Sequence, residues 1–210
     1  MIRFRHLAPL GATTLVAGLL LFFAPQPSQA QQSAIWLDQA TPINWNRPGM
    51  EIPTPEPPLI GGLAATPSDW PPPCITQLRH AETDEDQQLA ALGWYLAQPY
   101  QAGYGIKVIP AQASFDGMCR PWGYNYFVFV DGVFAGTIAP SAMNARSDGS
   151  ASTVNFFGGS TPRLFATFQR YTPQDALCCP SAQSSVQYTI QISPPLVIPT
   201  NASTSPSQGG

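Results

Sequence analysis

The chain has 210 residues, of which 10% are charged and 24 are proline, and its formal net charge is −3. Only one of its nine basic residues is a lysine (Lys107), so it lacks the basic footprint of a nucleic-acid-binding domain and the high charge of a solvated disordered chain. Two histidines and four cysteines leave little material for a metal or catalytic cluster, and we expect neither a metal nor a cofactor.

The first 30 residues have the pattern of a secretory signal peptide. Arg3 and Arg5 precede an apolar run over 10–24, and Ser28-Gln-Ala30 supplies a small-x-Ala cleavage site. A retained membrane anchor is the alternative, but the run is shorter than the roughly 20 apolar residues that a spanning helix needs. We therefore predict cleavage after Ala30 and a secreted or periplasmic protein with no transmembrane anchor. No cysteine precedes Cys74, so we expect no lipid anchor.

The chain after Ala30 divides into three parts. Cleavage removes two arginines and no acid, which makes the net charge −5 and argues against nucleic acid and anionic membranes as partners. Residues 31–73 contain ten prolines and are expected to form an extended arm. Residues 74–193 are expected to form one domain, and residues 194–210, rich in Pro, Ser, Thr and Gly, a disordered tail.

The Pro-rich arm carries two apolar clusters, Ile35-Trp36-Leu37 and Ile43-Asn-Trp45. Exposed tryptophans in a free arm are costly without a partner. We therefore favour an arm that lies against the domain as a strap. The alternative is a short linear motif that docks elsewhere in the envelope.

One helix is well indicated before Pro99. Thr83 can cap a first turn of three acids, Asp84-Glu-Asp86, which suits the positive end of a helix dipole. Leucines follow at spacings of three and four over 89–96. The acidic turn could be imagined as a metal site, but capping is the interpretation we prefer.

The sequence after Tyr100 is typical of strands. Asp131-Gly132 predicts a two-residue type I′ hairpin, and the strand before it is apolar on both faces, as in the middle of a sheet. We predict an α+β domain, with one N-terminal helix packed on a curved antiparallel sheet of five to six strands. The predicted strands cover 105–109, 124–130, 133–139, 152–157, 164–171 and 185–192.

The even number of cysteines in an exported chain favours disulfides. Adjacent cysteines seldom satisfy disulfide geometry. We therefore expect Cys74 and Cys119 each to pair with one of Cys178 and Cys179, and both such pairings remain open. A four-cysteine zinc site is the alternative, although the chain has no Cys-x-x-Cys spacing.

Two motifs carry a family resemblance. The hairpin contains Phe127-Val-Phe-Val-Asp-Gly-Val-Phe-Ala-Gly-Thr137, and Arg170-Tyr171 and Cys178-Cys-Pro180 follow it. Over about 74–192 the chain resembles the LppP/LprE lipoprotein family and its uncharacterised exported cyanobacterial-type relatives. The resemblance implies export and an envelope location, but it brings no established activity and no catalytic residue.

A search for catalytic residues is mostly negative. His80 is the only histidine after Ala30, and an ordinary surface role beside Arg79 and Glu82 explains it. Paired carboxylates could serve glycoside hydrolysis. Four acids are available for such a pair, but three of them directly precede glycine, which favours turns: Asp116, Asp131, Asp148 and Asp175.

The best recognition cluster is Arg120, Trp122 and Tyr124, with Arg146 from a later loop. Arginine can hold a carboxylate or phosphate, and aromatic side chains can stack on a ring. Alternatively, Arg120 pairs with Asp116 and Trp122 fills the rim of the core. We expect a disulfide-stabilised exported domain that binds a protein or an envelope polymer without catalysis. A small envelope hydrolase and a purely structural envelope component are the alternatives.

Overall fold

The computed structural model describes residues 35–56, 59–60, 63–64, 68 and 70–207. The predicted signal peptide and its cleavage site at Ala30 lie outside these residues. Before the domain, the described chain forms a 3-10 helix η1 (Ile35–Asp38), a small β1–β2 ladder (Leu59–Ile60, Leu63–Ala64) and a short helix α2 (Pro72–Ile75).

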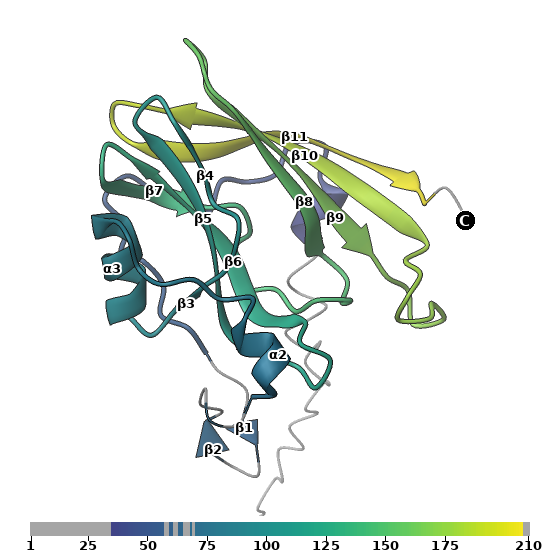
Figure 1. The fold of residues 1–210 in the computed structure, drawn as a ribbon. Coiled ribbons are helices and arrows are strands. Elements are labelled where there is room, and N and C mark those ends of the chain that lie inside the picture. Colours follow the sequence, from purple (N-terminus) through teal and green to yellow (C-terminus); the bar gives the residue numbers. More distant parts are fainter. Residues whose placement is uncertain (1–34, 57–58, 61–62, 65–67, 69, 208–210) are drawn as a thin grey trace, which may run out of the picture.

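Two antiparallel sheets face each other in the domain (Figure 1). The first sheet has the order β3-β5-β6-β7, with β4 also paired to β5, and the second has the order β11-β10-β9-β8. The strands of the first sheet are β3 (Tyr95–Leu96), β4 (Gln101–Gly103), β5 (Ile106–Phe115), β6 (Pro121–Val130) and β7 (Val133–Thr137). Those of the second are β8 (Ser150–Phe157), β9 (Arg163–Arg170), β10 (Ala182–Gln191) and β11 (Leu196–Pro206).

Strand β6 is buried on both faces, as its sequence predicts. Val128 and Val130 point into the core between the sheets, whereas Phe127 and Phe129 belong to a second cluster with Leu89 of helix α3 (Asp84–Ala91). Alternate side chains of a strand face opposite sides, so one apolar strand serves both layers. The turn between β6 and β7 has positive φ at both central residues, Asp131 and Gly132, as a type I′ turn requires.

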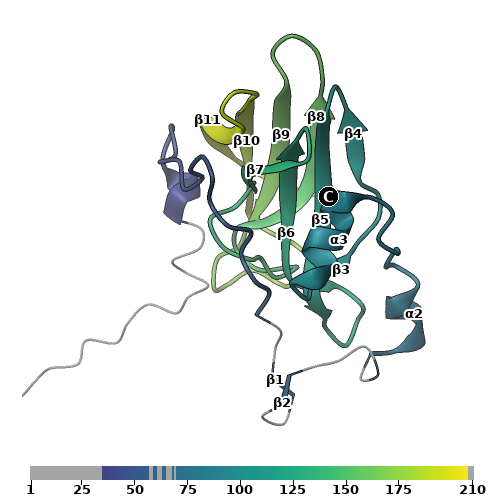
Figure 2. The same ribbon diagram turned by 90° about the vertical axis from the view of Figure 1, so that its left-hand side faces the viewer.

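Helix α3 begins where the sequence predicts and ends earlier. Thr83 forms a capping box with Asp86, but the helix stops at Ala91, before Gly93 with its φ of 94°. The later residues Tyr95–Leu96 are strand β3 instead of helix. Figure 2 shows that α3 covers only part of the outer face of the first sheet.

The predicted α+β fold with a single sheet is therefore wrong, because the domain is mostly β with two sheets. The eight-residue helix covers part of one face of the first sheet, and the other face is buried by the second sheet. The segment predicted to be a disordered tail supplies one of its strands. β11 pairs with β10 along its length, and Val197 and Ala202 enter the core.

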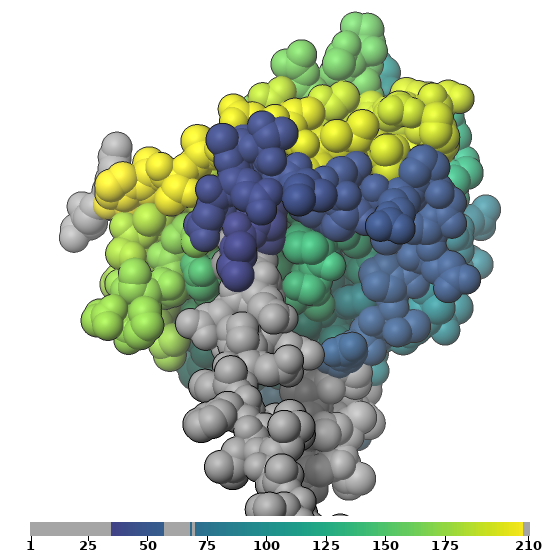
Figure 3. Space-filling view, turned by 180° about the vertical axis from the view of Figure 1, so that it is seen from behind, coloured from purple at the N-terminus to yellow at the C-terminus, as the bar shows by residue number. Residues whose placement is uncertain are grey.

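The arm packs against the domain as a strap, as we favoured from its tryptophans. Trp36 is buried against Phe168, with ring centroids 5.1 Å apart, and Trp45 packs beside it. Figure 3 shows the arm lying across the C-terminal strands. The side chain of Asn46 donates to the carbonyl oxygens of Thr137 and Val197, and it accepts from the backbone N–H of Thr137.

The predicted disulfide pairings are also wrong. Cys74 pairs with Cys119, and Cys178 pairs with its neighbour Cys179. Helix α2 places Cys74 beside the turn between β5 and β6, in a cluster with Trp70 and Phe115. The Cys178–Cys179 doublet lies in the connection between β9 and β10 of the other sheet, so the two bridges do not link the two regions as we expected.

Candidate functional site

A cleft of about 480 Å³ opens between the two sheets. One wall comes from β5 and β6, and the other from β8 and the end of β9. Arg120, Tyr124 and Arg146 line it, so three of the four residues of the predicted recognition cluster meet in one place. The role in ligand binding remains a prediction.

Arg120 is held by the tight turn that precedes β6. Asp116 accepts from the Arg120 Nε and also from the backbone N–H groups of Met118 and Arg120. Although burial opposes ionisation of Asp116, these hydrogen bonds and the guanidinium hold its pKa below the usual range. The predicted pairing of Arg120 with Asp116 is confirmed, and Arg120 also lines the cleft, whereas its recognition of a ligand stays a prediction.

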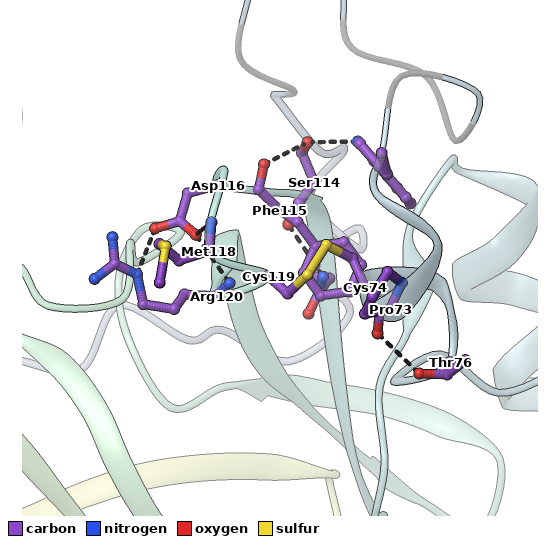
Figure 4. The surroundings of a disulfide bond; sticks show 11 residues. Pro73, Cys74, Thr76, Ser114, Phe115, Asp116, Met118, Cys119 and Arg120 are labelled. Carbon is purple, nitrogen blue, oxygen red and sulfur yellow. Dashed lines mark hydrogen bonds and ion pairs between the residues drawn. A yellow bond between two sulfur atoms is a disulfide. The ribbon is translucent and has the colours of Figure 1, made fainter.

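The disulfide fixes the same turn from its other side. Cys119 has a φ of 60° and is bridged to Cys74 of α2, with Cα atoms 4.7 Å apart. Figure 4 shows the two terminal nitrogens of Arg120 pointing away from the disulfide, while Asp116 holds only the Nε. Within the described residues those terminal nitrogens have no hydrogen-bond partner, so they are available to a ligand.

Arg146 reaches the cleft because its loop is fastened to β6. The backbones of Met143 and Tyr124 exchange two hydrogen bonds of 2.7 and 2.8 Å, and Asn144 accepts from the N–H of Gly123. Arg146 is exposed and has a φ of 59°. Arg120 and Arg146 both act electrostatically on the hydroxyl of Tyr171, so the two guanidinium groups share one neighbourhood.

Two tyrosines of β6 form part of the cleft wall. Tyr124 donates its hydroxyl to the carbonyl oxygen of Ala151 at 2.6 Å, which ties β6 to β8. Burial raises the pKa of both Tyr124 and Tyr126, so both remain neutral phenols. Within the described residues the hydroxyl of Tyr126 has no hydrogen-bond partner, although it lies in the cleft wall.

Trp122 is the predicted residue that does not line the cleft. It is 38% exposed, and the positive φ of 62° at Gly123 interrupts the regular alternation between Trp122 and Tyr124. Sequence reasoning missed Tyr126, Gln112 and Gln169, which do line it. Tyr126 could have been found from its spacing of two from Tyr124, whereas the glutamines come from strands whose pairing the sequence does not reveal.

The cleft differs in charge from a second hollow of about 470 Å³ beside the arm. There, Arg170 is paired with both Asp38 and Asp148, so its charge is neutralised. In the part of the chain that the structure describes, no Asp or Glu lines the cleft that holds Arg120 and Arg146. Arg120 is itself paired with Asp116, so Arg146 is the cleft arginine that has no ion-pair partner within the described residues, on a protein whose net charge is negative.

Three of the four acids considered for hydrolysis have structural partners, and the fourth, Asp131, lies in the β6–β7 turn. Asp175 accepts from the backbones of Thr172 and Ser181, and these hydrogen bonds lower its pKa to about 2. Asp116 also has a lowered pKa, although a general acid needs a raised one. Asp148 accepts from Arg170 and from the backbone of Tyr171. His80 is exposed.

The acidic first turn of α3 is also explained by structure. Asp86 is paired with Arg79, and Glu85 with Lys107. A search of the described residues for three or more His, Cys, Asp or Glu side chains placed to hold a metal ion found no such group. Four-cysteine zinc binding is excluded by the two disulfides.

The cleft residues discussed above all fall within one segment that runs from β5 to β10. Residues 107–192 match the model of the LppP/LprE lipoprotein family. This match confirms the resemblance seen in the hairpin and the Cys-Cys-Pro motif, and the LppP/LprE description indicates an envelope-associated protein of unknown function. No curated protein and no solved structure matches the chain. Among the described residues, no helix is long and apolar enough to cross a membrane.

Proposed function

We propose that this protein is an exported envelope component that binds an envelope polymer in the cleft between its two sheets, without catalysis. The observation that carries the proposal is the convergence of Arg120, Arg146 and two neutral tyrosines on one concave surface. Its volume of about 480 Å³ lies within the range of roughly 300–1,000 Å³ of ligand sites.

The walls of the cleft are built to keep their shape. The disulfide and Asp116 hold Arg120, the Met143–Tyr124 ladder holds the loop of Arg146, and the Tyr124 hydroxyl joins the two sheets. A site whose groups are held in place before binding loses less conformational entropy when a ligand arrives. This rigidity favours recognition of a repeating polymer unit.

The test is a binding titration with envelope polysaccharide extracted from the source organism. The wild-type protein, the double variant Arg120→Ala/Arg146→Ala and the control Arg163→Ala are compared by isothermal titration calorimetry. Arg163 is an exposed arginine at the start of β9 that does not line the cleft. We expect wild type and Arg163→Ala to bind alike and the double variant to lose binding.

Two results would overturn the proposal. One is a wild-type protein that does not bind the extracted polysaccharide, and the other is binding that the double variant retains in full. Chromatography of the polymer after incubation tests the absence of catalysis, because shortened products that depend on the protein would show hydrolysis.

A further inference from the structure

The chemistry of the cleft wall indicates which kind of polymer unit it takes. The wall carries two arginines and, within the described residues, no carboxylate; Asp116, which does not line the cleft, is paired with Arg120, so the unpaired positive charge is that of Arg146. A cleft with one sign of charge between low-dielectric walls concentrates ligands of the opposite charge. The ligand is therefore expected to carry a negative group.

The orientation of Arg120 favours a planar anion. Asp116 accepts from the Nε of the guanidinium, so the two terminal nitrogens, which point away from the disulfide, are the two prongs left for a ligand. Two parallel N–H···O bonds from such a fork match the two oxygens of a carboxylate. Arg146 has no hydrogen-bond partner within the described residues and lines the same cleft, so it can add a second positive charge.

The rest of the wall suits hydroxyl groups better than apolar side chains. Gln112 donates its amide to the carbonyl oxygen of Ser114, which leaves its own oxygen as an acceptor. Gln169 uses its oxygen to accept from Ser150 and Tyr171, which leaves its amide nitrogen as a donor. The hydrogen bonds to Ser114, Ser150 and Tyr171 therefore fix the Gln112 oxygen as an acceptor and the Gln169 nitrogen as a donor. Tyr126 adds a hydroxyl that has no hydrogen-bond partner among the described residues.

We infer that the cleft binds a carboxylate-bearing sugar unit of an acidic polysaccharide, with the carboxylate on Arg120 and Arg146 and the ring hydroxyls on Gln112, Gln169 and Tyr126. This inference rests on the proposed function and names its ligand class. A peptide ligand fits less well, because these positions offer polar groups where a peptide's apolar side chains would need an apolar pocket.

The experiment compares two probes that differ in one group. An oligoglucuronate of defined length and its carboxyl-reduced, neutral counterpart are titrated into the wild-type protein by isothermal titration calorimetry. We expect the acidic oligomer to bind at least about tenfold more tightly, the cost of losing one charge-assisted bidentate contact. The preference should shrink as salt rises, because exposed charge pairs are screened.

Variants assign the preference to the cleft. Arg120→Ala should remove most of the discrimination between the two oligomers, and Arg120→Ala/Arg146→Ala should abolish it. Arg120→Lys should retain only part of it because an ammonium group lacks the fork, and Arg163→Ala should leave it unchanged. Gln169→Leu should weaken both oligomers equally, since it removes a hydroxyl contact and no charge. Each variant is checked by circular dichroism and thermal melting, so that loss of the fold is not taken for loss of the site.

The outcomes separate this inference from the proposed function. Equal binding of the acidic and neutral oligomers overturns the carboxylate assignment and leaves polymer binding standing. Binding of poly-glutamate with no binding of oligoglucuronate overturns the sugar assignment. No binding of oligoglucuronate, together with Arg120-dependent binding of the extracted polysaccharide, also overturns the inference while the proposed function survives.

Discussion

The two edges of the β-sandwich, where the two sheets meet side by side, differ in what fills the space between the sheets. At the β7–β11 edge, the arm fills the gap between the sheets with Trp36, Trp45 and Asn46. At the opposite edge, the side chains of Gln101 and Tyr124 join the first sheet to β8, and the cleft that Arg120 lines has walls from β5, β6 and β8. The edge that the chain itself covers is part of the core, whereas the other edge keeps a cleft of about 480 Å³.

The links at the two edges use the same chemistry. Asn46 acts as a substitute peptide group between β7 and β11, since it donates to Thr137 and Val197 and accepts from Thr137. Gln101 of β4 does the same for β8, donating to the Val154 carbonyl and accepting from the Phe156 N–H. These contacts also occupy backbone groups of edge strands that could otherwise pair with another chain.

The largest effect is expected from the disulfide that supports the open edge. Removal of the bridge by Cys74→Ala/Cys119→Ala opens a loop of 45 residues, and chain entropy predicts a loss of about 4 kcal/mol in the free energy of unfolding. Because Cys119 precedes Arg120, the variant should also lose ligand affinity at the cleft. Guanidinium denaturation and calorimetric titration measure the two effects.

The matched control is the pair Cys178→Ala/Cys179→Ala. That bridge joins neighbouring residues, so it closes almost no loop, and its removal should change the free energy of unfolding by less than about 1 kcal/mol. Equal losses from the two double variants would contradict the assignment of stability to the Cys74–Cys119 bridge.

The next effect belongs to the covered edge. Asn46→Ala removes three hydrogen bonds from a buried site, including those to the Thr137 N–H and the Val197 carbonyl, while the Thr137 carbonyl still accepts from Trp45, so we expect a loss of about 3 kcal/mol. Gln101→Ala removes two bonds from a half-buried site and should cost about half as much. Both are measured by urea denaturation.

Asn46→Ala should leave cleft affinity unchanged at temperatures where the variant is folded, because its contacts lie on the other edge. Ile43→Ala is the control within the arm, since Ile43 is 78% exposed and its truncation should change stability by less than about 0.5 kcal/mol. A larger loss from Ile43→Ala than from Asn46→Ala would show that the arm acts through general apolar contact.

The features that could be predicted from the sequence are those that depend on residues close together along the chain. The Thr83 cap, the Asp131-Gly132 turn and the two-sided burial of β6 follow from local patterns, and all three are confirmed. The strap follows from the cost of exposed tryptophan. Arg120 and Arg146 were chosen for their chemistry, and their meeting in one cleft depends on the Met143–Tyr124 pairing, which the sequence does not show.

The errors have long-range causes. Strand β11 contains Pro199 and many serines and threonines, a composition typical of a tail, and only pairing with β10 makes it a strand. The disulfide assignment treated a bridge between adjacent cysteines as excluded, although Cys74 lies next to Cys119 once α2 folds against the β5–β6 turn. Neither fact is encoded within a short window of residues.

The smallest effect is a pH dependence that involves neither edge. Asp86 of α3 is buried, which opposes its ionisation, but Arg79 and the backbone N–H groups of Glu82 and Thr83 bond its carboxylate and hold its pKa below the usual value. A carboxyl with a lower pKa in the folded state stabilises the protein above its unfolded pKa of about 4, and this contribution is lost as the pH falls through the folded value.

Stability should therefore fall as the pH drops below about 5, with a slope of at most about 1.4 kcal/mol per pH unit for this one group. Glu85, Asp116 and Asp175 also have lowered pKa values, so Asp86→Asn should make the slope shallower without removing it. Thr83→Ala removes the other half of the capping box and should lower the free energy of unfolding by about 1 kcal/mol at pH 7, with a small further change of slope because the Thr83 hydroxyl helps to lower the pKa of Glu85. Denaturant titrations at pH 7, 5, 4 and 3 distinguish the two variants, and an unchanged slope in Asp86→Asn would show that its ion pair with Arg79 is not the source of the acid sensitivity.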